Sequence, residues 1–267
     1  MENATVEQRR AKILDKLQEM RLLDDSLMTK FFEEELQCTE FVLRIILDKP
    51  DLMVKEAKTQ YNIKNLQGRS ARLDVRAVCG KGKIYDIEVE RSDKRASPKR
   101  ARHNLSILDS NALLPGDDVE KLPETYVIMI TENDFWGKGE PIYQIKRYVG
   151  DTGIVYNDSS YIIYVNGDYK DDSPEKSDLA KLIHDFNCQK ADDMYSSVLA
   201  NRLRYFKEDE KGRKEMCKVI EDLMNEEKKE IAITMLEEGF PIEQIARLLR
   251  LTADKVEEFI NGEKMLV

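Results

Sequence analysis

The chain has 267 residues, with 43 lysines and arginines against 52 aspartates and glutamates, and a formal net charge of −9 at pH 7. Its 41 % hydrophobic and 36 % charged residues, with only 12 glycines and 7 prolines, exclude a disordered or collagen-like chain and predict one or two globular domains. No apolar run approaches the ~20 residues of a membrane span, and the charged N-terminus lacks the apolar core of a signal peptide, so we expect a cytoplasmic protein without a membrane partner.

The first segments predict helices. Residues 3–22 and 26–48 place apolar side chains at helical spacing, and Pro50 ends the second segment.

From residue 71 the apolar residues recur with a period of two. Residues 71–78 alternate in this way, and so do residues 84–90 after a turn centred on Lys81 that contains Gly80 and Gly82. A β-hairpin is therefore predicted, with Asp86, Glu88 and Glu90 on one face of its second strand.

The remaining elements alternate between helix and strand. A helix begins at Ser97-Pro98, with proline in its first turn, and runs to about Leu113. A buried strand is predicted over 126–131, peripheral strands over 142–149 and 161–165, helices over 176–210 and 213–238, and two short helices after Gly239.

The hairpin predicts a cluster of carboxylates. If Lys81 is the centre of the turn, Asp74 lies directly opposite Glu88, and Glu90 lies on the same face. Three converging carboxylates repel unless a cation or proton neutralises them, and oxygen ligands suit Mg²⁺ or Mn²⁺. The alternative is a solvated sheet face on which Arg72 and Arg76 pair with these acids. The pattern alone leaves both interpretations open.

Other catalytic groups are scarce. Four separated cysteines and two isolated histidines predict no zinc site, and we expect the cysteines to be buried thiols. The chain has no phosphate-binding or dinucleotide-binding glycine motif and no serine-nucleophile motif. Any chemistry must therefore depend on carboxylates.

A basic segment follows the acidic strand directly. Six cations and Asp93 give residues 91–102 a net charge of +5 in an otherwise acidic chain. Beside a catalytic metal ion, such cations would hold a DNA backbone, although a solvated helix face is the alternative. The predicted DNA-binding residues are Arg91, Lys94, Arg95, Lys99, Arg100 and Arg102.

These motifs resemble a known family. The segments RLDVRA and YDIEVERSDK, the following basic helix, PETYVIMITENDFWGKG and a later HDF are similar to the PD-(D/E)XK nuclease family transposases, which are related to recombination-promoting nucleases. The segment from Asp24 to Phe32 is similar to a short Asp-x-x-Phe-Lys signature of that group. The resemblance covers about residues 20–190.

The resemblance implies an α/β fold of restriction-endonuclease type, with a mixed sheet flanked by helices, and a Mg²⁺-dependent (or Mn²⁺-dependent) endonuclease that hydrolyses DNA phosphodiester bonds in recombination or mobile-element movement. Asp74 and Glu88 would bind the metal ion with the carbonyl of Val89. Asp25 would contribute to metal binding more weakly. Alternatively, Asp25 is a helix N-cap, or Glu33, Glu34 or Glu35 is the contributing acid in its place.

Glu90 departs from the superfamily pattern, which has lysine there, whereas the related transposase group often has glutamine or another polar residue. It would act as a further ligand or general base, with Arg91, Lys94 or Lys99 as the cation. The departure leaves open a second function, a weak or inactive DNA-binding or interaction protein that keeps the nuclease fold.

After residue 210 the sequence predicts only helices and no further strand. We expect a nuclease-like domain over 1–210 and a helical C-terminal tail over 211–267, whose two short last helices resemble a helix-turn-helix with Thr252 capping the second. The acidic second helix suits a major groove poorly. A structural tail, with homo-oligomer formation through its helices, is therefore favoured.

Overall fold

The computed structural model describes residues 2–63, 70–80 and 82–264. The chain forms two compact units. We call residues 18–213 the sheet unit, and residues up to Leu17 together with those from Lys214 onward the helical unit.

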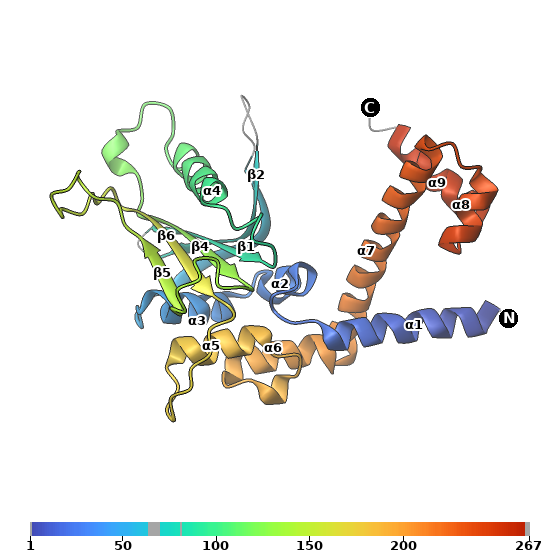
Figure 1. The fold of residues 1–267 in the computed structure, drawn as a ribbon, viewed down its shortest axis with the longest axis horizontal. Coiled ribbons are helices and arrows are strands. Elements are labelled where there is room, and N and C mark those ends of the chain that lie inside the picture. Colours follow the sequence, from blue (N-terminus) through green and yellow to red (C-terminus); the bar gives the residue numbers. More distant parts are fainter. Residues whose placement is uncertain (1, 64–69, 81, 265–267) are drawn as a thin grey trace. The chain divides into compact units, whose positions relative to one another are not determined.

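The sheet unit is built on a mixed six-stranded sheet with the order β1-β2-β3-β4-β6-β5 (Figure 1). The three strands β3, β4 and β6 run parallel, and each of the other pairs is antiparallel. This is the mixed α/β sheet that the resemblance implied. The strands are β1 Val54–Ile63, β2 Ala71–Cys79, β3 Ile84–Glu90, β4 Thr125–Thr131, β5 Ile142–Ile145 and β6 Ser160–Asn166.

Helices cover both sides of the sheet. Figure 1 shows α4 on one side and α3, α5 and α6 on the other. On the α4 side, Leu105 and Leu108 are buried in one cluster with Val127, Met129 and Tyr164 of the sheet. Helix α1 Glu2–Glu19 belongs almost entirely to the helical unit. The helices of the sheet unit are α2 Asp25–Phe32, α3 Leu36–Leu47, α4 Pro98–Ser110, α5 Asp178–Asn187 and α6 Ser197–Lys207, with short 3-10 turns η1 Val119–Lys121 and η2 Ala191–Asp193.

Several predicted elements have different bounds. The helix predicted over 26–48 is divided at residues 33–35, where Glu34 takes a positive φ of 55°. The helix predicted over 176–210 is interrupted after Asn187. The strand predicted over 142–149 ends at Ile145, and beyond it only an isolated bridge joins Tyr148 to Val155.

Strand β1 was not predicted. Its sequence VKEAKTQYNI is rich in charged and polar side chains, and its buried residues do not alternate strictly. Because β1 lies at the edge of the sheet, it tolerates lysines that an interior strand would not.

The predicted hairpin has the predicted register. Val75 pairs with Ile87 and Val78 with Ile84, as a turn centred at position 81 requires, although Lys81 itself lies outside the described residues. The environment of its second strand differs from a solvated face. Asp86 and Glu88 are 0 % exposed and Glu90 is 3 % exposed. The solvated-face interpretation is therefore wrong, because β3 lies inside the sheet beneath α4.

The helical unit contains α8 Ile242–Leu249 and α9 Ala253–Lys264, and most of α7 Glu210–Glu237. Ala232 of α7 packs in one apolar cluster with Ile245, Val256 and Phe259 of the short helices. The hydroxyl of Thr252 accepts a hydrogen bond from the Lys255 N–H at 3.2 Å, so the predicted cap is confirmed. The boundary at residue 210 and homo-oligomer formation stay predictions.

Among the described residues, no helix combines the length and the apolar character needed to cross a bilayer.

Candidate active site

The structure brings Asp74, Glu88 and Glu90 together. Each of these residues offers a carboxylate oxygen within 4.8 Å of the oxygens of the other two. The hydrogen bonds between them continue the sheet where the β2–β3 pairing ends at Val75 and Ile87. Glu88 Oε1 accepts the Asp74 N–H at 3.1 Å, and Asp74 Oδ2 accepts the Val89 N–H at 3.1 Å. The side chains of Glu88 and Asp74 thus accept N–H groups that backbone carbonyls accept elsewhere in the sheet. These hydrogen bonds fix the positions of the two carboxylates.

Negative charge in this cluster is poorly solvated. Burial raises the pKa of Asp74 to about 8, and the charge of Glu88 acts in the same direction. Burial also raises the pKa of Glu90, although Arg100 opposes this effect. A cation placed among these oxygens would lower both pKa values.

Asp86 lies deeper on the same strand. It is fully buried, its Oδ2 accepts a hydrogen bond from Asn104 Nδ2 at 3.0 Å, and its Oδ1 has no partner among the described residues. Burial, followed by the charge of Glu88, raises the pKa of Asp86 well above its ordinary value. Sequence reasoning placed Asp86 on the acidic face but gave it no role.

Arg100 is the cation that contacts the cluster most closely. Its Nη2 lies 2.6 Å from Glu88 Oε2 and its Nη1 lies 2.6 Å from Glu90 Oε1. Burial alone would lower the pKa of Arg100, but the charges of Glu88 and Glu90 raise it above the ordinary value. We expected Arg91, Lys94 or Lys99 in this position, so the identity of the cation is corrected.

The geometry of α4 explains why Arg100 and Asn104 face the acidic strand. Four residues of a helix rise about 6 Å and two residues of a strand rise about 6.6 Å. A helix that returns along β3 therefore keeps every fourth side chain opposite every second strand residue. Arg100 contacts Glu88, and Asn104 contacts Asp86. The start of the helix is fixed by Ser97, whose hydroxyl accepts the Arg100 N–H at 3.3 Å, and by Pro98 at the predicted place.

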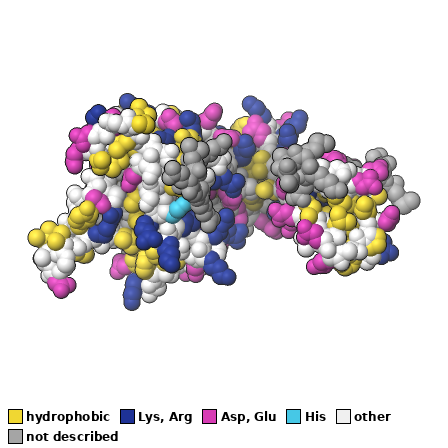
Figure 2. All heavy atoms as spheres, turned by 90° about the horizontal axis from the view of Figure 1, so that it is seen from above, with side chains coloured by type: hydrophobic (Ala, Val, Ile, Leu, Met, Phe, Trp, Pro, Cys, Tyr) yellow, Lys and Arg dark blue, Asp and Glu magenta, His cyan; other side chains and the backbone are white. Residues whose placement is uncertain are grey.

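A cleft of about 640 Å³ opens beside the cluster. Asp74 and Glu90 line it together with four of the six cations predicted to bind DNA: Lys94, Arg95, Lys99 and Arg100. Of the other two, Arg102 is exposed on α4 and Arg91 contacts a different group of residues. Lysine and arginine side chains are numerous on the surface of the sheet unit in Figure 2.

Asp25 also lines this cleft. It is the first residue of α2, and Asp24 occupies the N-cap position, so the alternative of Asp25 as an N-cap is wrong. Its Oδ1 accepts a hydrogen bond from Gln60 Nε2 at 3.3 Å. The alternative acids Glu33 and Glu34 are exposed, and Glu35 lies 3.8 Å from Arg202.

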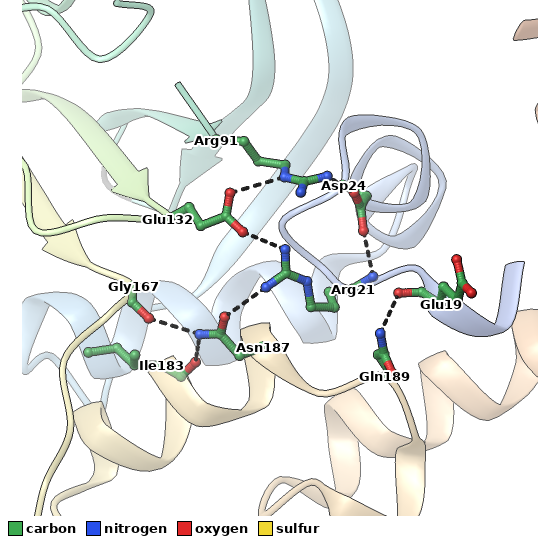
Figure 3. Close-up of polar contacts among 9 residues, drawn as sticks. All are labelled: Glu19, Arg21, Asp24, Arg91, Glu132, Gly167, Ile183, Asn187 and Gln189. Carbon is green, nitrogen blue, oxygen red and sulfur yellow. Dashed lines mark hydrogen bonds and ion pairs between the residues drawn. The ribbon is translucent and has the colours of Figure 1, made fainter. Parts of the chain in front are cut away.

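Arg91 belongs to a closed ring of four charges (Figure 3). It binds Asp24 Oδ1 at 2.5 Å and Glu132 Oε2 at 3.1 Å. Arg21 closes the ring, donating from its backbone N–H to Asp24 and from its side chain to Glu132. The ring links the end of β3 to the start of α2, and so places Asp25 relative to Glu90. Sequence reasoning missed Glu132, although its position directly after a buried strand beside β3 was a usable signal.

A second group of potential ligands consists of His184, Asp185 and Cys188. Both oxygens of Asp185 accept backbone N–H groups at 2.8 Å, from Tyr195 and Ser196 at the start of α6. Burial raises the pKa of Cys188 to about 11, which disfavours the thiolate. These contacts explain the group as the polar support of a helix start. Cys38, Cys79 and Cys188 are buried as predicted, whereas Cys217 is only half-buried, so the prediction of a buried thiol is wrong for Cys217.

The fold and this cluster define a class of protein. The second and third strands of the mixed sheet bring an aspartate to a Glu-x-Glu segment, and a helix returns over both strands. This arrangement is a nuclease fold of the PD-(D/E)XK type. Residues 39–238 match the PD-(D/E)XK nuclease family transposase, and the chain belongs to that family. No curated protein and no solved structure matches the chain.

Proposed function

We propose that the protein is a metal-dependent DNA endonuclease that hydrolyses phosphodiester bonds in recombination or in the movement of mobile elements. The observation that carries this proposal is the convergence of Asp74, Glu88 and Glu90 within 4.8 Å beside a cleft lined by cations.

The donor set fits a hard divalent cation. Carboxylate oxygens and a backbone carbonyl are the ligands that Mg²⁺ and Mn²⁺ prefer. Asp74 and Glu88 would hold the ion, with the carbonyl of Val89 and, from the start of α2, Asp25. When bound, the ion would supply a water of lowered pKa and neutralise charge on the phosphodiester.

The protein's own residues would position the substrate. Lys94 and Lys99 line the cleft and have no ion-pair partner in the described part of the chain, so both are available to DNA phosphates. Glu90 lies beside the other carboxylates, where it would accept a proton from an attacking water or act as a further ligand.

A second function is favoured by one specific observation. Arg100 forms ion pairs with both Glu88 and Glu90, and Glu90 stands where the superfamily pattern has lysine. A nuclease fold with this arrangement would also serve as a weakly active or inactive DNA-binding protein.

A plasmid assay separates the two functions. Supercoiled plasmid is incubated with the full chain in Mg²⁺, in Mn²⁺ and in EDTA, beside Asp74→Ala and Glu88→Ala. Asp168→Ala is the matched control, because Asp168 is exposed and pairs only with Lys170 at 3.2 Å among the described residues. An endonuclease gives metal-dependent nicking that both cluster variants lose and the control keeps. Salt-sensitive DNA binding without any nicking identifies the binding protein instead.

A further inference from the structure

Arg100 bridges two acids that belong to the proposed metal site. Its two terminal nitrogens are divided between Glu88 Oε2 and Glu90 Oε1, each at 2.6 Å. The next cation, Arg95, is 3.9 Å from Glu90 and its side chain is 63 % exposed, whereas the Arg100 side chain is 28 % exposed. Arg100 is therefore the internal counter-ion of the cluster.

We infer that Arg100 couples metal binding to DNA binding by moving from these two carboxylates to a DNA phosphate when the carboxylates bind a divalent ion. The inference rests on the proposed function, since it takes Asp74, Glu88 and Glu90 as the metal site.

The first reason is competition for the same oxygens. Glu88 Oε1 accepts the Asp74 N–H and Glu88 Oε2 accepts from Arg100, so an ion bound to Glu88 would share an oxygen with one of these two donors. A guanidinium and a divalent ion on adjacent oxygens also repel each other strongly in a partly buried site. Metal binding therefore weakens the hold of Glu88 and Glu90 on Arg100.

The second reason is that a suitable acceptor would lie within reach of the guanidinium. Arg100 lines the cleft together with Lys94 and Lys99, the residues proposed to hold phosphates. A guanidinium binds phosphate with the same two-nitrogen geometry that it uses for carboxylates. The backbone N–H of Arg100 is fixed by Ser97, so the transfer needs only rotation of its side chain.

The consequence is reciprocal cooperativity. If DNA takes Arg100 away from Glu88 and Glu90, DNA must strengthen metal binding by the same factor by which metal strengthens DNA binding. Arg100 would thus supply the positive charge that Glu90 cannot, and would supply it only when ion and DNA are both present.

The test measures Mn²⁺ binding by calorimetry on the full chain. Arg100→Gln removes the charge, and Arg147→Gln is the matched control, because Arg147 is an exposed arginine that pairs with Asp158 and does not line the cleft. We expect Arg100→Gln to bind Mn²⁺ about tenfold more tightly than the wild type, because a unit charge at contact distance is removed. Arg147→Gln should change the affinity less than about threefold, because its charge is exposed, screened and outside the cleft.

The titration is then repeated with a phosphorothioate duplex that resists cleavage. DNA should tighten Mn²⁺ binding of the wild type about tenfold, within the usual range of coupling between sites, and that of Arg100→Gln less than about threefold. Arg100→Lys keeps the charge and should bind Mn²⁺ as the wild type does. If it binds as tightly as Arg100→Gln, charge is not the cause and the inference is overturned.

Two failures are distinguishable. Equal Mn²⁺ affinity in the wild type and Arg100→Gln, lost in both when Asp74→Ala is added, overturns the role of Arg100 and leaves the metal site in place. If neither the wild type nor Arg100→Gln binds Mn²⁺, the proposed metal site is itself wrong. Urea unfolding of each variant confirms that it is folded.

Discussion

Replacing Asp74 with asparagine should stabilise the protein in EDTA while abolishing metal binding. The amide of the substituted side chain would still offer an oxygen to the Val89 N–H that now lies 3.1 Å from Asp74 Oδ2, but it would carry no charge beside Glu88 and Glu90. If the cluster is a metal site, its charge repulsion is a cost to folding that an ion normally removes.

The magnitude follows from the raised pKa. Because the Asp74 pKa rises from 3.8 to about 8, the folded chain holds an extra proton in this interval, and the free energy of unfolding falls as the pH rises from 3.8 to about 8. At 1.36 kcal/mol per unit the fall is at most about 6 kcal/mol. Water reaches the cleft and reduces this value. We therefore expect Asp74→Asn to raise the free energy of unfolding by about 2 to 4 kcal/mol at pH 8 and by clearly less at pH 5.

Urea unfolding in EDTA at both pH values measures this difference. Asp168→Asn is the control and should stay within about 0.5 kcal/mol of the wild type. Added Mn²⁺ should stabilise the wild type and not Asp74→Asn. If Asp74→Asn is less stable than the wild type at pH 8 in EDTA, the carboxylate is a structural acceptor and the reasoning is refuted.

Three further predictions concern the sheet unit. Lys207→Met should lower the free energy of urea unfolding by about 3 kcal/mol or more, because the buried Lys207 ammonium donates to three backbone carbonyls; a loss below about 1 kcal/mol contradicts this. Gly167→Ala should cost at least about 2 kcal/mol in the same assay, because a Cβ there would lie 2.3 Å from the carbonyl oxygen of Thr131; unchanged stability would show that this contact relaxes freely. Arg91→Gln should leave the salt dependence of DNA binding unchanged in fluorescence anisotropy, because Arg91 is engaged by Asp24 and Glu132. Lys99→Gln should reduce the slope of log affinity against log salt concentration by about one. The opposite result would return Arg91 to the DNA interface.

Much of the fold was predictable because it depends on local periodicity. The alternation in β2, the buried run of β4 and the Ser97-Pro98 helix start all report contacts that are close in sequence. Strand β1 was not predictable in this way, because an edge strand with charged side chains has no alternating pattern. The breaks in the two long predicted helices depend on partners distant in sequence, such as Asp185, which holds the start of α6.

The sequence by itself predicted the register of the β2–β3 hairpin, which brings Asp74 close to Glu88, because a two-residue repeat about a turn fixes which side chains share a face. It also determined that cations follow the acidic strand. Tertiary structure decided the rest. The burial of β3 depends on strands and a helix packed from elsewhere, and this burial turns a charged sheet face into a site where charge is costly. The choice of Arg100 as counter-ion, and of Arg91 for a structural ring, depends on how α4 and α2 pack on the sheet, which no local pattern specifies.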